Sequence, residues 1–342
     1  MKIGVLAGGG DAPGLNAALK AIVMKSYEYG WEVVGIKRGW AGLIDSDVQP
    51  LNPDVVKQIH SQGGIILYTS RTNPFSIEKG PEKAIENIKK LGLNALIAMG
   101  GEDTLSVAQK LYELGVHVVG VPKTIDNDLS ETDYSIGFDT SVSIATDAID
   151  RLRTTAESHQ RVIIVELMGR HTGWIALYAG LAGGAHMILI PEVPYKLSEI
   201  YETLKKRHSK GAVYSIIVVA EGANPVDVKD AIIKSKEKDA FGHERLGGIS
   251  QILEKLIEEN TGFETRAVTL GHIQRSGTPT AFDRVLAARL GVKAAELVKE
   301  RKFGFMPSLQ GSNIGSVSLK DAIARRKAVS LELYNLAQSF IR

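Results

Sequence analysis

The stretch KIGVLAGGGDAPGLNAALKAIV, residues 2–23, decides the fold of this chain. Residues 2–7 are mostly apolar and read as a buried strand, and three consecutive glycines follow them. Beyond the glycines, Leu15, Leu19 and Ile22 recur at helical spacing. A strand that passes into a helix through a glycine loop predicts a βα unit, from which mostly parallel sheets are built.

The same pattern continues along the chain. Val- and Ile-rich runs alternate with helical patterns, which predicts an α/β fold. The segment 139–157 has helical spacing and suits a connector between two lobes, whereas the polar segment 226–246 is predicted to be a surface insertion. The expected strands lie at 2–7, 32–36, 95–99, 117–121, 162–167, 187–190, 214–220 and 266–270.

The composition excludes several classes of protein. Of 342 residues, 44% are hydrophobic and 23% are charged, which is typical of a soluble globular protein. The 41 Lys and Arg nearly balance the 39 Asp and Glu, so the net charge of +2 predicts neither a nucleic-acid partner nor an anionic membrane partner. The absence of cysteine excludes disulfides and thiolate chemistry and fits a cytoplasmic location. No apolar run is long enough to predict a membrane span.

The first candidate ligand loop is Gly8, Gly9, Gly10 and Asp11. Successive backbone N–H groups between a strand and a helix can cradle an anion. The spacing matches neither a Walker A loop nor a dinucleotide fingerprint, and a tight turn without a ligand explains such glycines almost as well.

A second loop lies in AMGGEDT, residues 98–104, where a strand ends in two glycines. Glu102 and Asp103 then stand at the carboxyl end of a strand, which is where open α/β sheets bind ligands. One of these acids can hold Mg²⁺, because this ion prefers oxygen ligands. The alternative is that Asp103 or Thr104 caps a helix that begins near Leu105.

The third loop is PKTIDND, residues 122–128, and it again follows a strand. In an extended segment, Asp126 and Asp128 would point to the same side. One acid could then orient or contact metal while the other removes a proton. Asp-Asn-Asp is equally good turn material, so this structural alternative stays open.

Together these loops resemble the 6-phosphofructokinase family, in particular its pyrophosphate-dependent branch. Five further motifs follow in the family's order: IGFDT (136–140), SHQR (158–161), VELMGRHTGW (165–174), AEG (220–222) and GHIQRSG (271–277).

The resemblance covers the whole chain and implies two Rossmann-like three-layer lobes with largely parallel sheets. It implies a phosphoryl-donor lobe at 1–138 plus about 275–320, and a sugar-phosphate lobe at 139–274 plus about 321–342. It also implies a cytoplasmic homodimer or homotetramer with active sites shared between subunits.

The resemblance implies a Mg²⁺-dependent transfer of a phosphoryl group to the 1-hydroxyl of fructose 6-phosphate. Asp126 then acts as the general base, and Asp128 supports orientation and metal electrostatics. Thr124 contacts the sugar near the reacting end, and Arg170 stabilises charge on the transferred group. The candidate metal ligand is Glu102.

The implied sugar-phosphate residues supply hydrogen bonds and concentrated positive charge. Arg161 and Arg266 resemble residues that reach in from a neighbouring subunit. The full implied set is Thr124, Asp126, Arg161, Met168, Gly169, Arg170, Glu221, Arg266, His272 and Arg275.

The second loop indicates the donor. In this loop the ATP-using relatives resemble one another in the motif GGDG or GGEG. This chain has Asp103 in place of the final glycine of that motif. A carboxylate about 4 to 5 Å from a phosphate charge costs on the order of 3 to 4 kcal/mol. The combination of Asp103 with Lys123 therefore favours diphosphate over ATP as the phosphoryl donor, and ATP stays the alternative donor. The expected donor residues are Gly10, Arg71, Asp103, Thr104 and Lys123.

Overall fold

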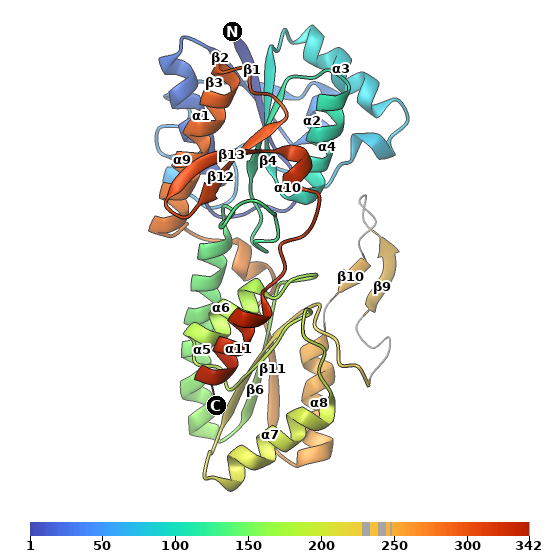
Figure 1. The fold of residues 1–342 in the computed structure, drawn as a ribbon, viewed down its shortest axis with the longest axis vertical. Coiled ribbons are helices and arrows are strands. Elements are labelled where there is room, and N and C mark those ends of the chain that lie inside the picture. The colour runs from blue at the N-terminus through green and yellow to red at the C-terminus, as the bar shows by residue number, and fades with distance from the viewer. Residues whose placement is uncertain (228–232, 239–243, 247, 342) are drawn as a thin grey trace. The chain divides into compact units, whose positions relative to one another are not determined.

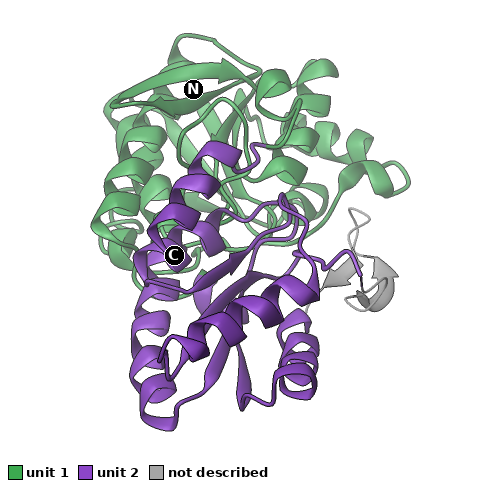
Figure 2. Cartoon of the chain, turned by 60° about the horizontal axis from the view of Figure 1, so that its bottom comes forward, with its two compact units in different colours: residues 1–140, 239–242, 275–326 green, residues 141–238, 243–274, 327–342 purple. Residues whose placement is uncertain are grey.

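The structure is a computed structural model, and it describes residues 1–227, 233–238, 244–246 and 248–341. The described chain forms two compact units (Figures 1 and 2). The first unit contains residues 1–140 and 275–326, and the second contains most of 141–274 together with 327–341. The chain therefore passes between the units after Thr140, after Gln274 and after Arg326.

A seven-stranded sheet forms the centre of the first unit, in the order β13-β12-β5-β4-β1-β2-β3. The five strands from β12 to β2 are parallel, and an antiparallel strand lies at each edge. The strands are β1 (Lys2–Ala7), β2 (Glu32–Ile36), β3 (Val48–Leu51), β4 (Ala95–Gly100), β5 (Val118–Pro122), β12 (Phe305–Gln310) and β13 (Asn313–Ser318).

Helices cover both faces of this sheet, because alternate side chains of each buried strand point to opposite faces. On one face Ile3, Val5 and Ala7 of β1 pack against α1 (Leu15–Glu28) and α9 (Ala281–Lys299). On the other face Leu6 packs in a core with residues of the remaining helices. These are α2 (Trp40–Asp45), α3 (Gly80–Lys90), α4 (Glu102–Glu113) and α10 (Leu319–Ala322).

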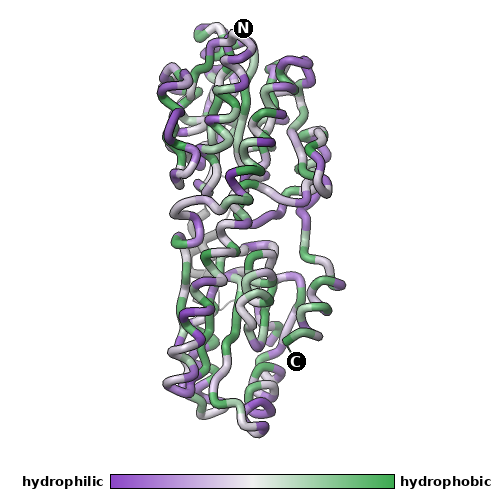
Figure 3. The backbone as a smooth tube through the Cα atoms, turned by 90° about the vertical axis from the view of Figure 1, so that its left-hand side faces the viewer, coloured by the Kyte–Doolittle hydropathy of each residue, from purple (hydrophilic) through white to green (hydrophobic). Residues whose placement is uncertain are grey.

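The second unit has a four-stranded, all-parallel sheet in the order β11-β6-β8-β7. Its strands are β6 (Val162–Leu167), β7 (Met187–Leu189), β8 (Ser215–Ala220) and β11 (Thr265–Thr269). Its helices are α5 (Phe138–His159), whose first residues belong to the first unit, α6 (Trp174–Ala182), α7 (Leu197–Ser209), α8 (Ile249–Thr261) and α11 (Leu331–Phe340). Hydrophobic stretches, drawn in green, recur along the backbone of the described chain (Figure 3).

All eight expected strands are present, and each of their ends lies within one residue of its expected position. The prediction of an α/β fold is confirmed. Within the predicted insertion at 226–246, residues 228–232 and 239–243 lie outside the described residues. Two strands within it, β9 (Ile233–Lys238) and β10 (Glu244–Leu246), form an antiparallel pair. Among the described helices, none is long and apolar enough to cross a membrane.

Candidate active site

The glycine loop of the first unit is packed too closely for side chains. A Cβ on Gly8 would lie 2.6 Å from the Thr104 hydroxyl, and one on Gly10 would lie 2.8 Å from Nη1 of Arg275. The N–H groups of Gly8 and Gly9 donate to the carbonyls of Met99 and Ser70, both at 3.0 Å. Two of the amides expected to cradle an anion are thus used inside the protein, and only later amides of the loop remain for a phosphate.

Lys123 binds the backbone of this loop through its side chain. Its side chain is buried, and its Nζ donates to the Gly8 carbonyl at 2.9 Å and to the Gly10 carbonyl. Burial and the nearby positive charge of Arg275 lower the pKa of Lys123 to about 7. Lys123 was expected among the donor residues, and its ammonium binds the backbone of the glycine loop.

The second loop differs from the prediction in where its helix begins. Helix α4 begins at Glu102, not near Leu105, and Gly101 is its N-cap residue, without a side-chain cap bond. The expectation that Asp103 or Thr104 caps the helix is therefore wrong. Asp103 lies in the first turn, where an acid is favoured by the helix dipole. Thr104 is buried against Gly8 and Gly100.

The third loop contains a turn and is not extended throughout, so the premise from which its two acids were expected to share a side does not hold. Asn127 has a φ of +50° and is buried. Its Oδ1 accepts from the Ser135 N–H at 3.0 Å, and its Nδ2 donates to the Asp133 carbonyl at 3.1 Å. The Asp126 N–H donates to the Thr124 hydroxyl at 3.1 Å. These bonds fix the loop that carries both acids.

The acids of the second and third loops influence each other electrostatically. Burial and the negative charge of Asp126 raise the pKa of Asp128 to about 7, and Glu102 adds to this effect. Glu102 also forms a 2.9 Å ion pair with Arg326. Within the described chain, no three acidic or histidine side chains are close enough together to enclose a metal ion.

Arg71 and Arg275 add positive charge beside the glycine loop. Ser70, which precedes Arg71, accepts the Gly9 N–H, and the Arg71 charge contributes to the lowered pKa of Lys123. Nη1 of Arg275 donates to the Asp11 carbonyl at 3.2 Å. The structure thus places Arg275, which was expected among the sugar residues, against the donor loop of the first unit.

In the second unit, three loops meet at the carboxyl ends of β6, β8 and β11. The Glu221 N–H donates to the Leu167 carbonyl at 2.8 Å, and the Gly222 N–H donates to the Gly169 carbonyl at 3.1 Å. The Met168 N–H donates to Oε1 of Gln274 at 3.3 Å.

These bonds bring together the loops that carry five of the expected sugar residues, and His272 lies in η3 (Gly271–Arg275) directly after β11. Gly169 has a φ of +139°, which an L side chain rarely adopts. The five residues are Met168, Gly169, Arg170, Glu221 and His272.

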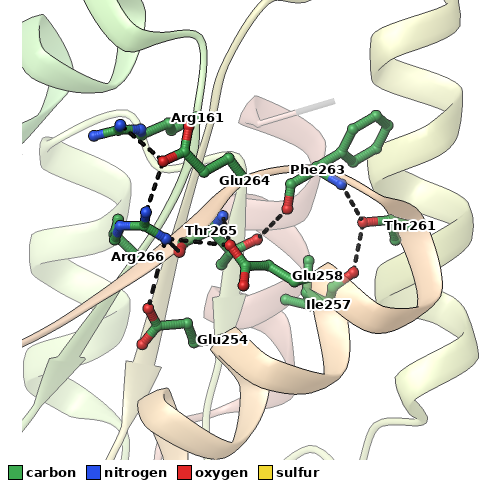
Figure 4. Close-up of polar contacts among 9 residues, drawn as sticks. All are labelled: Arg161, Glu254, Ile257, Glu258, Thr261, Phe263, Glu264, Thr265 and Arg266. Atoms are coloured by element: carbon green, nitrogen blue, oxygen red, sulfur yellow. Dashed lines mark hydrogen bonds and ion pairs between the residues drawn. The ribbon is translucent and has the colours of Figure 1, made fainter.

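Arg161 and Arg266 lie at the opposite end of the same sheet. Arg161 directly precedes β6, and Arg266 is the second residue of β11. Both guanidinium groups are 2.7 Å from Oε1 of Glu264, and Arg266 also pairs with Glu258 at 3.2 Å (Figure 4). The six residues of β6 span about 20 Å. Arg161 and Arg266 are therefore far from the loops at the carboxyl ends within their own unit.

Two buried acids that bind the backbone at the start of a helix were not predicted from the sequence. Glu166 accepts from the N–H and hydroxyl of Ser250 at 2.9 and 2.7 Å, at the start of α8. Asp283 accepts from the N–H groups of Gly137 and Thr140 at 2.9 and 2.8 Å, at the start of α5. An acid inside the apolar run VIIVEL was the available signal for Glu166, because a buried charge needs partners.

Glycine loops and acids at the carboxyl ends of parallel strands define an α/β protein of the class that binds ligands at that edge of its sheet. The family model described as phosphofructokinase matches residues 2–298. The chain is 54% identical over 342 residues to the pyrophosphate--fructose 6-phosphate 1-phosphotransferase of Amycolatopsis methanolica, covering 99% of each chain. It is 49% identical to ATP-dependent 6-phosphofructokinase 3 of Streptomyces coelicolor, covering 96% of each.

A structure of phosphofructokinase from Saccharomyces cerevisiae aligns with a TM-score of 0.81 at 29% identity. It covers 99% of this chain, which spans 46% of the yeast chain. The chain belongs to the phosphofructokinase family, as its motifs predicted, and its units have the fold of that family.

Proposed function

We propose that this protein transfers a phosphoryl group from pyrophosphate to the 1-hydroxyl of fructose 6-phosphate. The observation that carries the choice of donor is Asp103, which lies in the first turn of α4, two residues after Gly101. The relative from Amycolatopsis methanolica, named for pyrophosphate, supports this choice. An ATP-dependent activity is the second candidate, since a relative named for ATP is 49% identical.

In the proposed reaction, the sugar's 1-oxygen attacks the nearer phosphorus of pyrophosphate. A new P–O bond forms, the bridging P–O bond breaks, and phosphate leaves. Asp126 takes the proton of the attacking hydroxyl, and Thr124 orients this end of the sugar. The Arg170 guanidinium stabilises charge on the oxygens of the transferred group. Because one phosphoanhydride is exchanged for one phosphate ester, we expect the reaction to run in both directions.

The acids of the first unit fit Mg²⁺, which we propose as the cofactor. Burial and repulsion by Asp126 raise the pKa of Asp128, and a nearby cation relieves such repulsion. A magnesium site commonly uses one or two carboxylates and completes its shell with water and substrate phosphates. Glu102, with support from Asp128, would hold the ion. When bound, Mg²⁺ would neutralise charge on the donor's phosphate oxygens.

The pH dependence of the KM for pyrophosphate tests the proposed role of the Lys123 ammonium in the glycine loop. Below its pKa of about 7 the Lys123 side chain is a charged ammonium that donates to the Gly8 and Gly10 carbonyls; above that pKa the neutral amine donates weaker bonds to them. We expect the KM for pyrophosphate to rise about tenfold between pH 7 and 8.5.

The matched control is Lys123→Arg, because a guanidinium stays charged throughout this range. The titration of pyrophosphate itself is common to both proteins, so the ratio of their KM values isolates Lys123. A ratio that stays constant with pH would contradict the proposed role of the ammonium.

The sugar phosphate is proposed to lie against the loops after β6, β8 and β11 of the second unit. Glu221 would bind sugar hydroxyls, and His272 would bind the 6-phosphate. Met168 and Gly169 shape the loop, whereas Arg275, which donates to the Asp11 carbonyl, would add charge beside the glycine loop.

Arg161 lies about 20 Å from these loops along β6, and Arg266 lies about 13 Å from them along β11. We therefore propose that they serve the sugar phosphate of a second copy of this chain, in a cytoplasmic homodimer or homotetramer.

The shared site predicts a specific pattern for Arg266→Ala. We expect the KM for fructose 6-phosphate to rise at least tenfold while kcat changes less, because a binding contact is lost rather than a catalytic one. The matched control is Arg151→Ala, which removes an exposed arginine paired with Asp147 on α5.

Mixed oligomers of Arg266→Ala with Asp126→Asn should regain activity, because some sites then contain both intact residues. Absence of rescue, in subunits shown by mass spectrometry to have exchanged, would argue against a shared site. The sugar-phosphorylating activity itself is tested by forming fructose 1,6-bisphosphate from fructose 6-phosphate and pyrophosphate.

A further inference from the structure

The loop that carries Arg170 ends at Gly173, the N-cap residue of α6. The Gly173 N–H faces both carboxylate oxygens of Glu192, at 3.1 and 3.0 Å. A Cβ on Gly173 would lie 2.3 Å from Cβ of Ile190, so this backbone packs directly against the residue that follows β7. A carboxylate at a helix N-terminus also interacts favourably with the helix dipole. Glu192 thus fixes the point where the loop becomes a helix.

The other end of this loop is fixed as well. Gln274 accepts the Met168 N–H, and the Gly169 carbonyl accepts the Gly222 N–H. A Cβ on Gly222 would lie only 1.9 Å from the Arg170 carbonyl, so the two backbones are in direct contact. Only a few residues separate these anchors from Gly173. A displacement of Gly173 would therefore be transmitted to Arg170.

Glu192 also binds the C-terminal segment, residues 327–341. Its Oε1 accepts the Val329 N–H at 3.0 Å. The first residue of α6, Trp174, donates from Nε1 to the Lys327 carbonyl at 2.6 Å, and the Lys327 ammonium lies 5.4 Å from the Trp174 ring centre. One carboxylate therefore joins the C-terminal segment to the end of the Arg170 loop.

We propose that Glu192 is a positioning residue for Arg170 and that the C-terminal segment is part of the same support. This inference rests on the proposed role of Arg170 in phosphoryl transfer. The alternative is that Glu192 only stabilises the fold. The two differ in kinetics, because misplacing a catalytic cation lowers kcat, whereas a purely structural role lowers stability and leaves the kcat of folded protein unchanged.

The first test is Glu192→Ala. We expect kcat to fall about 10- to 100-fold, since a displacement of about 1 Å can cost a hundredfold. The KM for fructose 6-phosphate should stay within about threefold of the wild-type value, because the loops that carry Glu221 and His272 stay in place. The matched control, Asp227→Ala, removes a carboxylate that accepts the Leu197 N–H at 3.2 Å at the start of α7, and it should leave kcat unchanged.

If Glu192→Ala does not fold, Glu192→Asp serves instead. It keeps the charge but draws the carboxylate back by one methylene group, so it cannot reach both Gly173 and Val329. The expected loss in kcat is then about tenfold. A kcat within twofold of wild type in either folded variant would overturn the proposal.

A double-mutant cycle with Arg170→Ala separates this inference from the proposed function. If Glu192 acts through Arg170, adding Glu192→Ala to Arg170→Ala should lower kcat by less than twofold further. A further loss as large as in the wild-type background would overturn the inference while leaving the role of Arg170 intact. Near-normal kcat in Arg170→Ala alone would refute the proposed role of Arg170, and the inference with it.

Discussion

Replacing Asp126 with Asn lowers kcat by about a hundredfold or more, according to the proposed mechanism, because general-base assistance to the 1-hydroxyl is lost. The amide keeps the size of the carboxylate, so the turn fixed by Asn127 and Ser135 should survive. The KM for fructose 6-phosphate should change little, since the other sugar contacts remain. Steady-state kinetics with pyrophosphate as donor give both values.

Asp133→Asn is the matched control for this experiment. Asp133 belongs to the same connection, and its carboxylate accepts the Gly311 N–H at 2.6 Å, away from the proposed chemistry. We expect a kcat close to wild type for this variant. If Asp126→Asn retained more than about a fifth of the wild-type kcat, Asp126 would not be the base.

The second large effect is expected from Asp103→Gly. The charge and volume of Asp103 at the end of β4 would oppose the α-phosphate of ATP, and glycine removes both. A penalty on the order of 3 to 4 kcal/mol corresponds to at least a hundredfold in binding, so ATP use should rise by tens to hundreds of fold. Pyrophosphate use should fall, because the smaller donor fits loosely in the widened site. Adding Lys123→Gly should weaken pyrophosphate use further, because the glycine loop loses its support.

We call Asp103 a donor gate if its side chain excludes ATP from the site. The same experiment distinguishes this gate from a purely local role of Asp103 in its helix. Gly101, not Asp103, is the N-cap of α4, so a local role is limited to the helix dipole and to helix propensity. Such a role would cost about 1 kcal/mol of stability and leave donor preference unchanged. Asp103→Asn is the control, since it removes the charge and keeps the volume. An unaltered ratio of ATP to pyrophosphate kcat/KM in Asp103→Gly would refute the gate.

Much of the fold could be predicted from local sequence, because buried parallel strands are continuous runs of Val, Ile and Leu. Three strands of the first unit were missed for physical reasons. Strand β3 is short and contains Pro50, and it pairs at an edge of the sheet. Strands β12 and β13 contain Pro307 and several serines, and their hairpin turn, Gly311-Ser312, was the signal that could have revealed them.

The candidate site could be predicted in its residues but not in its contacts. Motifs named Lys123 and Asp126, yet the Lys123 bond to the Gly8 carbonyl joins residues 115 positions apart. No local pattern encodes such a contact. The contacts of Glu192 likewise depend on partners far along the chain, Gly173 and Val329. The turn at Asn127 uses nearer partners, Asp133 and Ser135, but no periodic pattern identifies them.

The central claim is that this phosphofructokinase uses pyrophosphate. The most direct test measures kcat/KM for phosphorylation of fructose 6-phosphate by the wild-type protein, with pyrophosphate, ATP and ADP compared side by side under saturating Mg²⁺. The proposed gate predicts that pyrophosphate exceeds both nucleotides by about a hundredfold. A wild-type protein that preferred ATP would contradict the claim.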